Sequence, residues 1–160
     1  MSGEVLVLGL GNELFSDEGV GVVAARRIEE RGLPAVEVVD GGTLGLSLLP
    51  TIEGRTALLV LDAIVSEDME PGETVVYDGE DLRREARLLW SAHQLGVNEV
   101  LAAADLAGST PERVAAVGMV PASVDTGYGL SRVATDALPA MVDAALEVLT
   151  SWGVKEPAHA

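Results

Sequence analysis

The sequence contains no cysteine among its 160 residues. This absence excludes a thiolate nucleophile, a disulfide framework and a cysteine-ligated zinc site. Basic residues are also few: 10 Lys and Arg stand against 26 Asp and Glu, which gives a formal net charge of −16. Such a charge repels nucleic acid and anionic membranes. It suits a basic peptide or a metal cation as a partner, or it simply keeps the chain soluble.

Long apolar runs are missing as well. No run approaches the roughly 20 residues of a membrane span. The N-terminus, MSGEVLVLGLGNE, lacks the basic region and small-residue cleavage site of a signal peptide. We therefore expect a cytoplasmic, monomeric protein that binds neither nucleic acid nor membrane. Its length favours one domain over residues 1–155, with a frayed tail over 156–160 that makes His159 a poor candidate for chemistry.

Short apolar runs alternate along the chain with segments of helical spacing. The apolar runs predict strands at residues 4–10, 36–40, 56–64, 73–78 and 113–121. The run at 73–78 alternates apolar and polar residues, as an edge strand does. Helical spacing predicts helices at residues 20–28, within 41–54, and at 80–90, 95–108 and 130–152. In the last helix, Ser131 is the expected cap, and Pro139 should kink or split the helix.

This alternation predicts an α/β fold. We expect a three-layer α/β/α sandwich with a twisted, mostly parallel sheet of about five strands and right-handed crossovers.

The turn after the first strand, GLGNELFSDEGVG, is rich in glycine and carries two adjacent acids, Asp17 and Glu18. A dinucleotide-binding turn would need a third glycine where Leu14 stands, and there is no Walker lysine. No serine lies in the G-x-S-x-G context of a hydrolase elbow. The acids suit the positive end of the following helix dipole, with Ser16 or Asp17 as its cap, or they face a cation.

Acids also end the next two predicted strands, at Asp40 and Asp62. If these strands are parallel neighbours, the carboxylates of Asp17, Glu18, Asp40 and Asp62 should converge on one edge of the sheet. A fold tolerates such a costly cluster when a cation is bound or when a carboxylate does acid–base work. The alternative is that each acid caps a helix or accepts a bond from a turn.

His93, in the segment SAHQLG, is the single histidine outside the tail. A lone histidine is more often a satisfied surface residue. It could instead complete a set of two oxygens and one nitrogen with acids of this edge, which suits a divalent ion such as nickel or zinc. This requires its loop to reach the acidic edge.

These motifs carry a resemblance over nearly the whole chain. Five segments of the chain resemble, in the same order, motifs of the nickel–iron hydrogenase maturation endopeptidases. They are VLGLGNELFSDEGVGV, VVDGGTLGLSLL, LLVLDAIVS, SAHQLGVNEVLAAADLAG and VAAVGMVPASVDTGYGLS. The combination of G-x-G-N-x-L-x-x-D-E-G, D-G-G-T and S-x-H-Q-L-G is specific, whereas each piece alone is weak. The resemblance leaves open which hydrogenase isoenzyme is served.

The resemblance implies an endopeptidase that removes a C-terminal extension from the precursor of the hydrogenase large subunit, after nickel has been inserted. The nickel then belongs to the substrate, and zinc or cadmium could substitute for it in vitro. By motif position, Glu18, Asp62 and His93 are the residues implied to recognise it.

The aspartate of the D-G-G-T motif is Asp40, our candidate catalytic residue for orienting a water or a ligand, although it could equally hold the turn. Gly41, Gly42 and Thr43 are predicted to lie against the substrate, because glycine allows close approach of backbones. Three alternatives stay open. The protein could be a nickel-dependent assembly chaperone that does not cleave, a metalloprotease with its own zinc, or a noncatalytic module whose acids cap helices.

Overall fold

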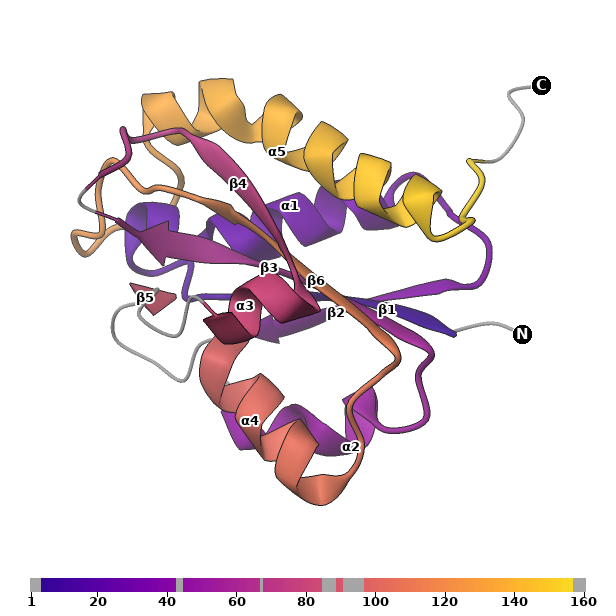
Figure 1. Cartoon of the computed structure of the whole chain (residues 1–160). Helices are drawn as coiled ribbons and strands as arrows, with labels where there is room; N and C mark the ends of the chain where they lie inside the picture. Colours follow the sequence, from indigo (N-terminus) through magenta and orange to yellow (C-terminus); the bar gives the residue numbers. More distant parts are fainter. Residues whose placement is uncertain (1–3, 43–44, 67, 85–88, 91–96, 157–160) are drawn as a thin grey trace.

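A five-strand path forms the centre of the computed structural model, which describes residues 4–42, 45–66, 68–84, 89–90 and 97–156 (Figure 1). The strand order is β2-β1-β3-β6-β4. The parallel members are β1 (Val5–Leu10), β2 (Val36–Gly42), β3 (Ala57–Val65) and β6 (Arg113–Met119). Strand β4 (Thr74–Asp78) pairs antiparallel with β6. The predicted α/β fold with a mostly parallel sheet is therefore confirmed.

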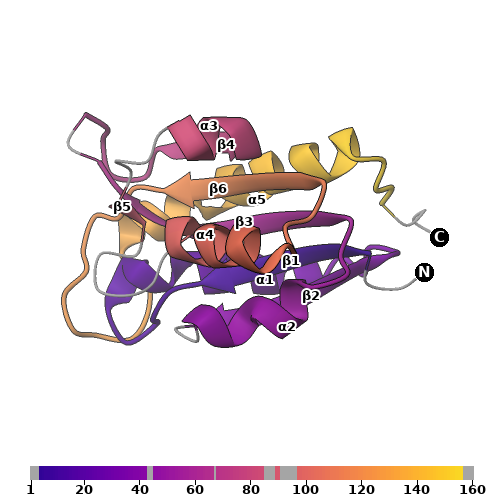
Figure 2. The same cartoon turned by 60° about the horizontal axis from the view of Figure 1, so that its bottom comes forward.

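Helices cover both faces of this sheet, which makes three layers (Figures 1 and 2). One face carries α1 (Val20–Glu29) and α5 (Arg132–Ser151). The other carries the 3₁₀ turn η2 (Gly45–Leu48), α2 (Leu49–Ile52), α3 (Gly79–Arg84) and α4 (Val97–Ala107). A second 3₁₀ turn, η1 (Ser16–Gly19), leads directly into α1. None of the helices in the described ranges has the length and apolar character needed to cross a bilayer.

Strand β1 shows why the core divides in two. Successive side chains of a strand point to opposite faces. Val5 and Val7 accordingly pack with α1 and α5, whereas Leu6 and Leu8 pack with η2, α2 and α4. Because both faces are covered, every residue of β1 is buried, and the strand is a continuous apolar run.

The edge strand and the last two helices largely agree with the predictions made from the sequence. Strand β4 lies at the sheet edge, as its alternation predicts. Helix α4 occupies most of the predicted 95–108 segment. At the start of α5, the Ser131 hydroxyl accepts a hydrogen bond from the amide of Ala134 at 3.1 Å, so the predicted cap is confirmed.

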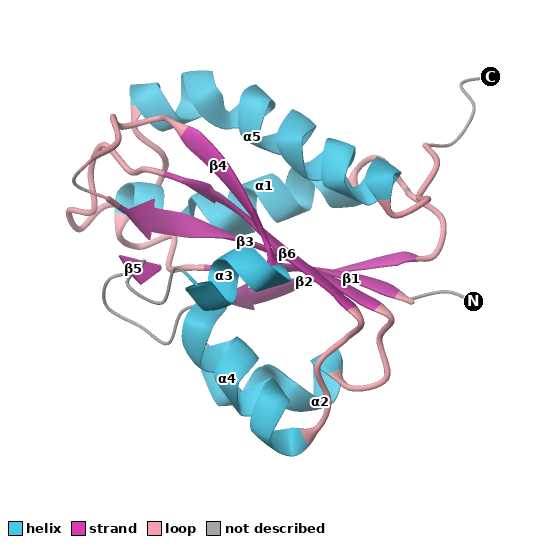
Figure 3. Cartoon of the chain, viewed as in Figure 1, coloured by secondary structure: helices cyan, strands magenta, loops and turns pink. Residues whose placement is uncertain are grey.

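Two predictions need correction (Figure 3). Helix α5 is one unbroken helix, so Pro139 does not split it, and a kink at Pro139 stays a prediction. Proline removes one amide donor, and packing against α1 and the sheet retains the helix. Residues 80–90 are not one helix. Helix α3 ends at Arg84, and Leu89–Trp90 forms a short strand, β5, in which Trp90 pairs antiparallel with Ile64 of β3.

The order of the strands reverses between β1 and β3. The chain passes from β1 to β2 through α1 on one face, and from β2 to β3 through η2 and α2 on the other. In open α/β sheets, ligands bind beyond the carboxyl ends of the strands at such a switch point. The fold therefore singles out the ends of β1 and β3 as the place to look for a site.

Candidate functional site

Glycines allow η1 and the first turn of α1 to lie directly on the ends of β1 and β3. Gly11 turns the chain with φ +126°, and a Cβ at this position would overlap the carbonyl oxygen of Glu18. A Cβ on Gly21 would collide with the carbonyl oxygens of Leu61 in β3 and Leu10 in β1. The glycine-rich turn thus serves close backbone packing at the switch point, and it brings the acids of η1 to that edge.

Two carboxylates are buried there. Glu18 is 1% exposed and Asp62 is 0% exposed. The pairing of β1 with β3 ends at Gly9 and Leu61, so Asp62 is the first residue of β3 beyond it. One oxygen of Asp62, Oδ1, accepts a hydrogen bond from the Ala63 amide at 2.8 Å. Buried carboxylates are costly for a fold, and this placement makes the pair the leading functional candidate.

Asp17, also 0% exposed, is bound to the loop that follows β6. Its Oδ2 accepts bonds from the amides of Ala122 and Ser123 at 2.9 and 3.2 Å. Its carboxylate also accepts the amide and the hydroxyl of Ser131, at 2.7 and 2.6 Å. The predicted capping role at α1 is wrong: the cap residue of α1 is Gly19, and neither η1 nor α1 has a side-chain cap bond. Asp17 instead fixes the 121–131 loop and the start of α5.

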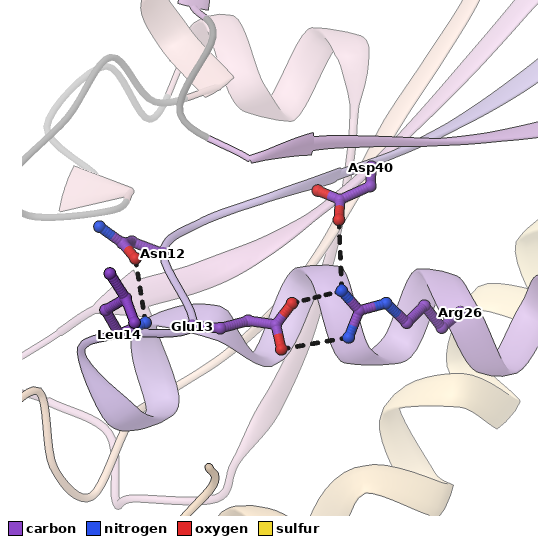
Figure 4. Close-up of polar contacts among 5 residues, drawn as sticks. All are labelled: Asn12, Glu13, Leu14, Arg26 and Asp40. Atoms are coloured by element: carbon purple, nitrogen blue, oxygen red, sulfur yellow. Dashed lines mark hydrogen bonds and ion pairs between the residues drawn. The ribbon is translucent and has the colours of Figure 1, made fainter. Parts of the chain in front are cut away.

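Asp40 lies at the end of β2 with its side chain 51% exposed. Its Oδ2 is 3.4 Å from a guanidinium nitrogen of Arg26 in α1, and Arg26 also binds both carboxylate oxygens of Glu13, at 2.5 and 3.1 Å (Figure 4). The hydrogen bonds that Arg26 donates to Glu13, together with the negative charges of Glu13 and Asp40, raise the pKa of Arg26 above its ordinary value. Arg26 thus ties the first turn to the end of β2.

The four acids do follow the carboxyl ends of parallel neighbouring strands, but their side chains have different surroundings. Glu18 and Asp62 are buried at the switch point, Asp17 serves the α5 loop, and Asp40 faces solvent and Arg26. Within the ranges that the structure describes, no three Asp, Glu or His side chains are grouped to hold a metal ion. A metal set built on Glu18 and Asp62 would thus need His93, which falls outside the described residues.

The predicted substrate-binding residues have separate positions. Gly41 is buried, and a Cβ there would press on Leu8, Leu10 and Leu48, so core packing by itself explains the glycine. Gly42 has φ +47°, and its carbonyl accepts a bond from Gly11 at 2.9 Å. Thr43 falls outside the described residues. Substrate contact by these three residues stays a prediction.

Sequence reasoning missed the link between Glu13 and Arg26. The two residues are 13 positions apart, and no local spacing rule pairs them. Arg26 did stand apart from the apolar stripe of its helix, but that is typical of any solvated residue. Only the geometry of β1, α1 and β2 identifies its partners.

The sheet order and the buried pair define an α/β protein whose candidate ligand site is the switch point of its sheet. A model of the hydrogenase maturation protease family (HycI) matches residues 22–148. The chain belongs to this family.

Curated relatives and solved structures extend the match beyond those residues. The Hydrogenase 2 maturation protease of Escherichia coli (strain K12) is 37% identical over 145 residues, which cover 89% of this chain and 86% of that protein. The hydrogenase expression/formation protein HupD of Rhizobium leguminosarum bv. viciae is 40% identical over 154 residues, covering 94% and 76%.

Among solved structures, the hydrogenase maturating endopeptidase HybD from E. coli superposes with a TM-score of 0.86 at 35% identity, covering 97% of this chain and 96% of that one. The [NiFe] hydrogenase maturation protease HybD from Thermococcus kodakarensis gives a TM-score of 0.74 at 28% identity, covering 92% and 99%.

Proposed function

We propose that this protein is an endopeptidase that removes the C-terminal extension of a nickel-loaded hydrogenase large-subunit precursor. In this proposal Glu18, Asp62 and His93 recognise the nickel ion. The observation that carries it is the burial of Glu18 and Asp62 at the switch point of a chain that belongs to the hydrogenase maturation proteases. The proposal includes a cytoplasmic location and a monomeric protease, both of which stay predictions.

The donor set suits a nickel ion that arrives with the substrate. Two carboxylates and one imidazole match the ligand preference of first-row divalent ions, so zinc or cadmium should substitute in vitro. A cation entering beside Glu18 and Asp62 would offset the cost of burying their charges. Support for including His93 comes from its neighbour in sequence: Trp90, three residues earlier, pairs with Ile64, two residues after Asp62.

Nickel recognition would act mainly by positioning. An ion shared between the precursor and these side chains holds the scissile bond at the switch point, and such positioning lowers a barrier by up to about 10 kcal/mol. Asp40 is the candidate for orienting the attacking water. Its half-exposed carboxylate is accessible from solvent and is held by Arg26 at 3.4 Å.

The decisive experiment compares two forms of one substrate. Purified protein is incubated with the precursor carrying nickel and with the same precursor lacking nickel, and the masses are measured. We expect a shortened chain only with nickel. If both precursors keep their mass while the nickel-loaded one still binds, the protein is a chaperone and the proposed cleavage is wrong.

Variants then test the recognition set. Glu18→Gln, Asp62→Asn and His93→Ala should each abolish cleavage, whereas Glu29→Gln, at an exposed acid of α1, should leave it unchanged. Full cleavage by the three variants would mean that these side chains are structural and that they do not recognise the nickel ion. Metal analysis of the isolated protein addresses the remaining alternative, because stoichiometric, tightly bound zinc would indicate a conventional metalloprotease.

A further inference from the structure

Two large apolar side chains stand out into solvent from neighbouring loops. Leu14 is 62% exposed and Tyr128 is 77% exposed. The loops are joined by backbone bonds: the Gly127 amide donates to the Leu14 carbonyl at 2.8 Å, and the Ser16 amide donates to the Gly127 carbonyl at 2.9 Å. We call Leu14 and Tyr128, with the bridge between Phe15 and Gly127, the apolar rim.

The backbone under the apolar rim is held from several sides. The Leu14 amide donates to the side-chain oxygen of Asn12 at 3.0 Å (Figure 4). The Ser16 hydroxyl donates to the carbonyl of Asp125 at 2.9 Å. The buried carboxylate of Asp17 binds the 121–131 loop near both of its ends. The backbone of these loops is therefore already ordered. Binding of a partner to the apolar rim would cost little backbone entropy, which favours binding.

The apolar rim borders the proposed site. Leu14 precedes Glu18 by four residues within one turn. Glu13, next to Leu14 in the chain, binds Arg26, and Arg26 contacts Asp40. Scattered single apolar residues on a surface need no explanation. Leu14 and Tyr128 differ from such residues, because hydrogen bonds join their loops beside the candidate active site.

We propose that the apolar rim binds the precursor itself, through a large apolar residue in the segment that flanks the scissile bond. This inference rests on the proposed function. The flanking segment is the natural occupant, because a peptide held at the switch point must pass over the loops that surround it. The exposed acids Asp40 and Asp125 make an acidic segment the wrong partner for this surface.

The test is the cleavage kinetics of the nickel-loaded precursor with Leu14→Ser, Tyr128→Ser and the double variant. Losing one buried apolar contact should raise KM roughly tenfold and leave kcat within about twofold. Leu106→Ser is the matched control. Leu106 is 91% exposed near the end of α4. Because α4 leads into the start of β6, Leu106 lies toward the amino ends of the parallel strands, away from the proposed site. Its replacement should therefore leave KM unchanged.

A KM that stays at the wild-type value in the double variant would overturn the proposal that the apolar rim binds the precursor. A decrease in kcat without a change in KM would overturn it as well. Failure of the proposed function looks different, because wild-type protein would then cleave neither precursor. In that case the rim is tested by the affinity of the nickel-loaded precursor for the wild-type and double-variant proteins. Equal affinities would overturn it, and a weaker double variant would support it.

Discussion

The carboxylate of Asp17 accepts two hydrogen bonds from Ser131, one from its amide at 2.7 Å and one from its hydroxyl at 2.6 Å. The same hydroxyl accepts the Ala134 amide and so caps α5. Asp17 therefore determines where α5 begins, while its neighbour Glu18 is buried at the switch point. Two consecutive acids have separate tasks, the first structural and the second a candidate for chemistry.

Replacing Asp17 should destabilise the protein severely. Asp17→Ala leaves four donors without their buried acceptor, and we expect the free energy of unfolding to fall by about 3 kcal/mol or more. Asp17→Asn should also lose stability, because its NH₂ group would face donors on one side. Urea unfolding measures both, with Asp143→Asn, at an exposed acid of α5, as the control. A stable Asp17→Asn protein would contradict the structural role.

The substitution Gly21→Ala should affect stability in two opposite ways, through helix propensity and through packing. Alanine in a helix is favoured over glycine by about 1 kcal/mol. At Gly21, however, the added methyl group would meet the carbonyl oxygens of Leu61 and Leu10. We expect packing to win, with a net loss of about 2 kcal/mol and reduced cleavage, because α1 must move off the strand ends.

Gly32→Ala is the matched comparison. Gly32 follows the same helix with φ +60° and has open space around it. Backbone strain alone should cost about 1 kcal/mol there, with cleavage unchanged. A more stable, fully active Gly21→Ala protein would show that the close approach of α1 to the sheet is not needed.

Much of the fold was predictable because the burial of a strand determines its pattern of apolar and polar residues. Strand β1 is buried on both faces and is therefore a continuous apolar run, and β4 alternates because it lies at an edge. Residues 80–90 were misassigned for the opposite reason. A two-residue strand such as β5 depends on pairing with Ile64, and no local pattern encodes that partner.

The site was predictable only in part. Strand-end logic does place Glu18 and Asp62 in buried positions near the ends of β1 and β3. It misses the bonds of Asp17 to the 121–131 loop, whose bonding residues are 105 to 114 positions further along the chain. Ser16, the residue before Asp17, has a positive φ of +54° in the η1 turn. It also fails for Asp40, whose partner Arg26 is 14 residues away. Side-chain direction in a turn depends on such backbone details, which composition and spacing do not reveal.

Arg26 should affect activity more than stability. Its guanidinium is half-exposed, so Arg26→Gln should lower the free energy of unfolding by less than about 1 kcal/mol. If Asp40 orients a water, losing the 3.4 Å contact should lower kcat with little change in KM. Arg27→Gln, at the adjacent exposed arginine, should behave as wild type.

A double-mutant cycle separates this role of Arg26 from a general effect of charge. Once Asp40→Asn has removed the carboxylate, Arg26→Gln should cause little further loss, because both changes act on one group. Additive losses in kcat would mean that Arg26 works independently of Asp40.

The buried pair should make the isolated protein sensitive to added divalent ions. A ligand that binds only the folded state stabilises it by about 2.7 kcal/mol at a hundredfold excess over Kd. We expect nickel, zinc or cadmium to raise Tm for the wild-type protein, and Glu18→Gln or Asp62→Asn to abolish that increase. The unfolding curves of the two variants without metal are the baseline for this comparison, and the amide oxygen introduced by Asp62→Asn can still accept the Ala63 amide. A metal-induced increase that persists in both variants would place the ion elsewhere, and it would remove the physical basis for nickel recognition at the switch point.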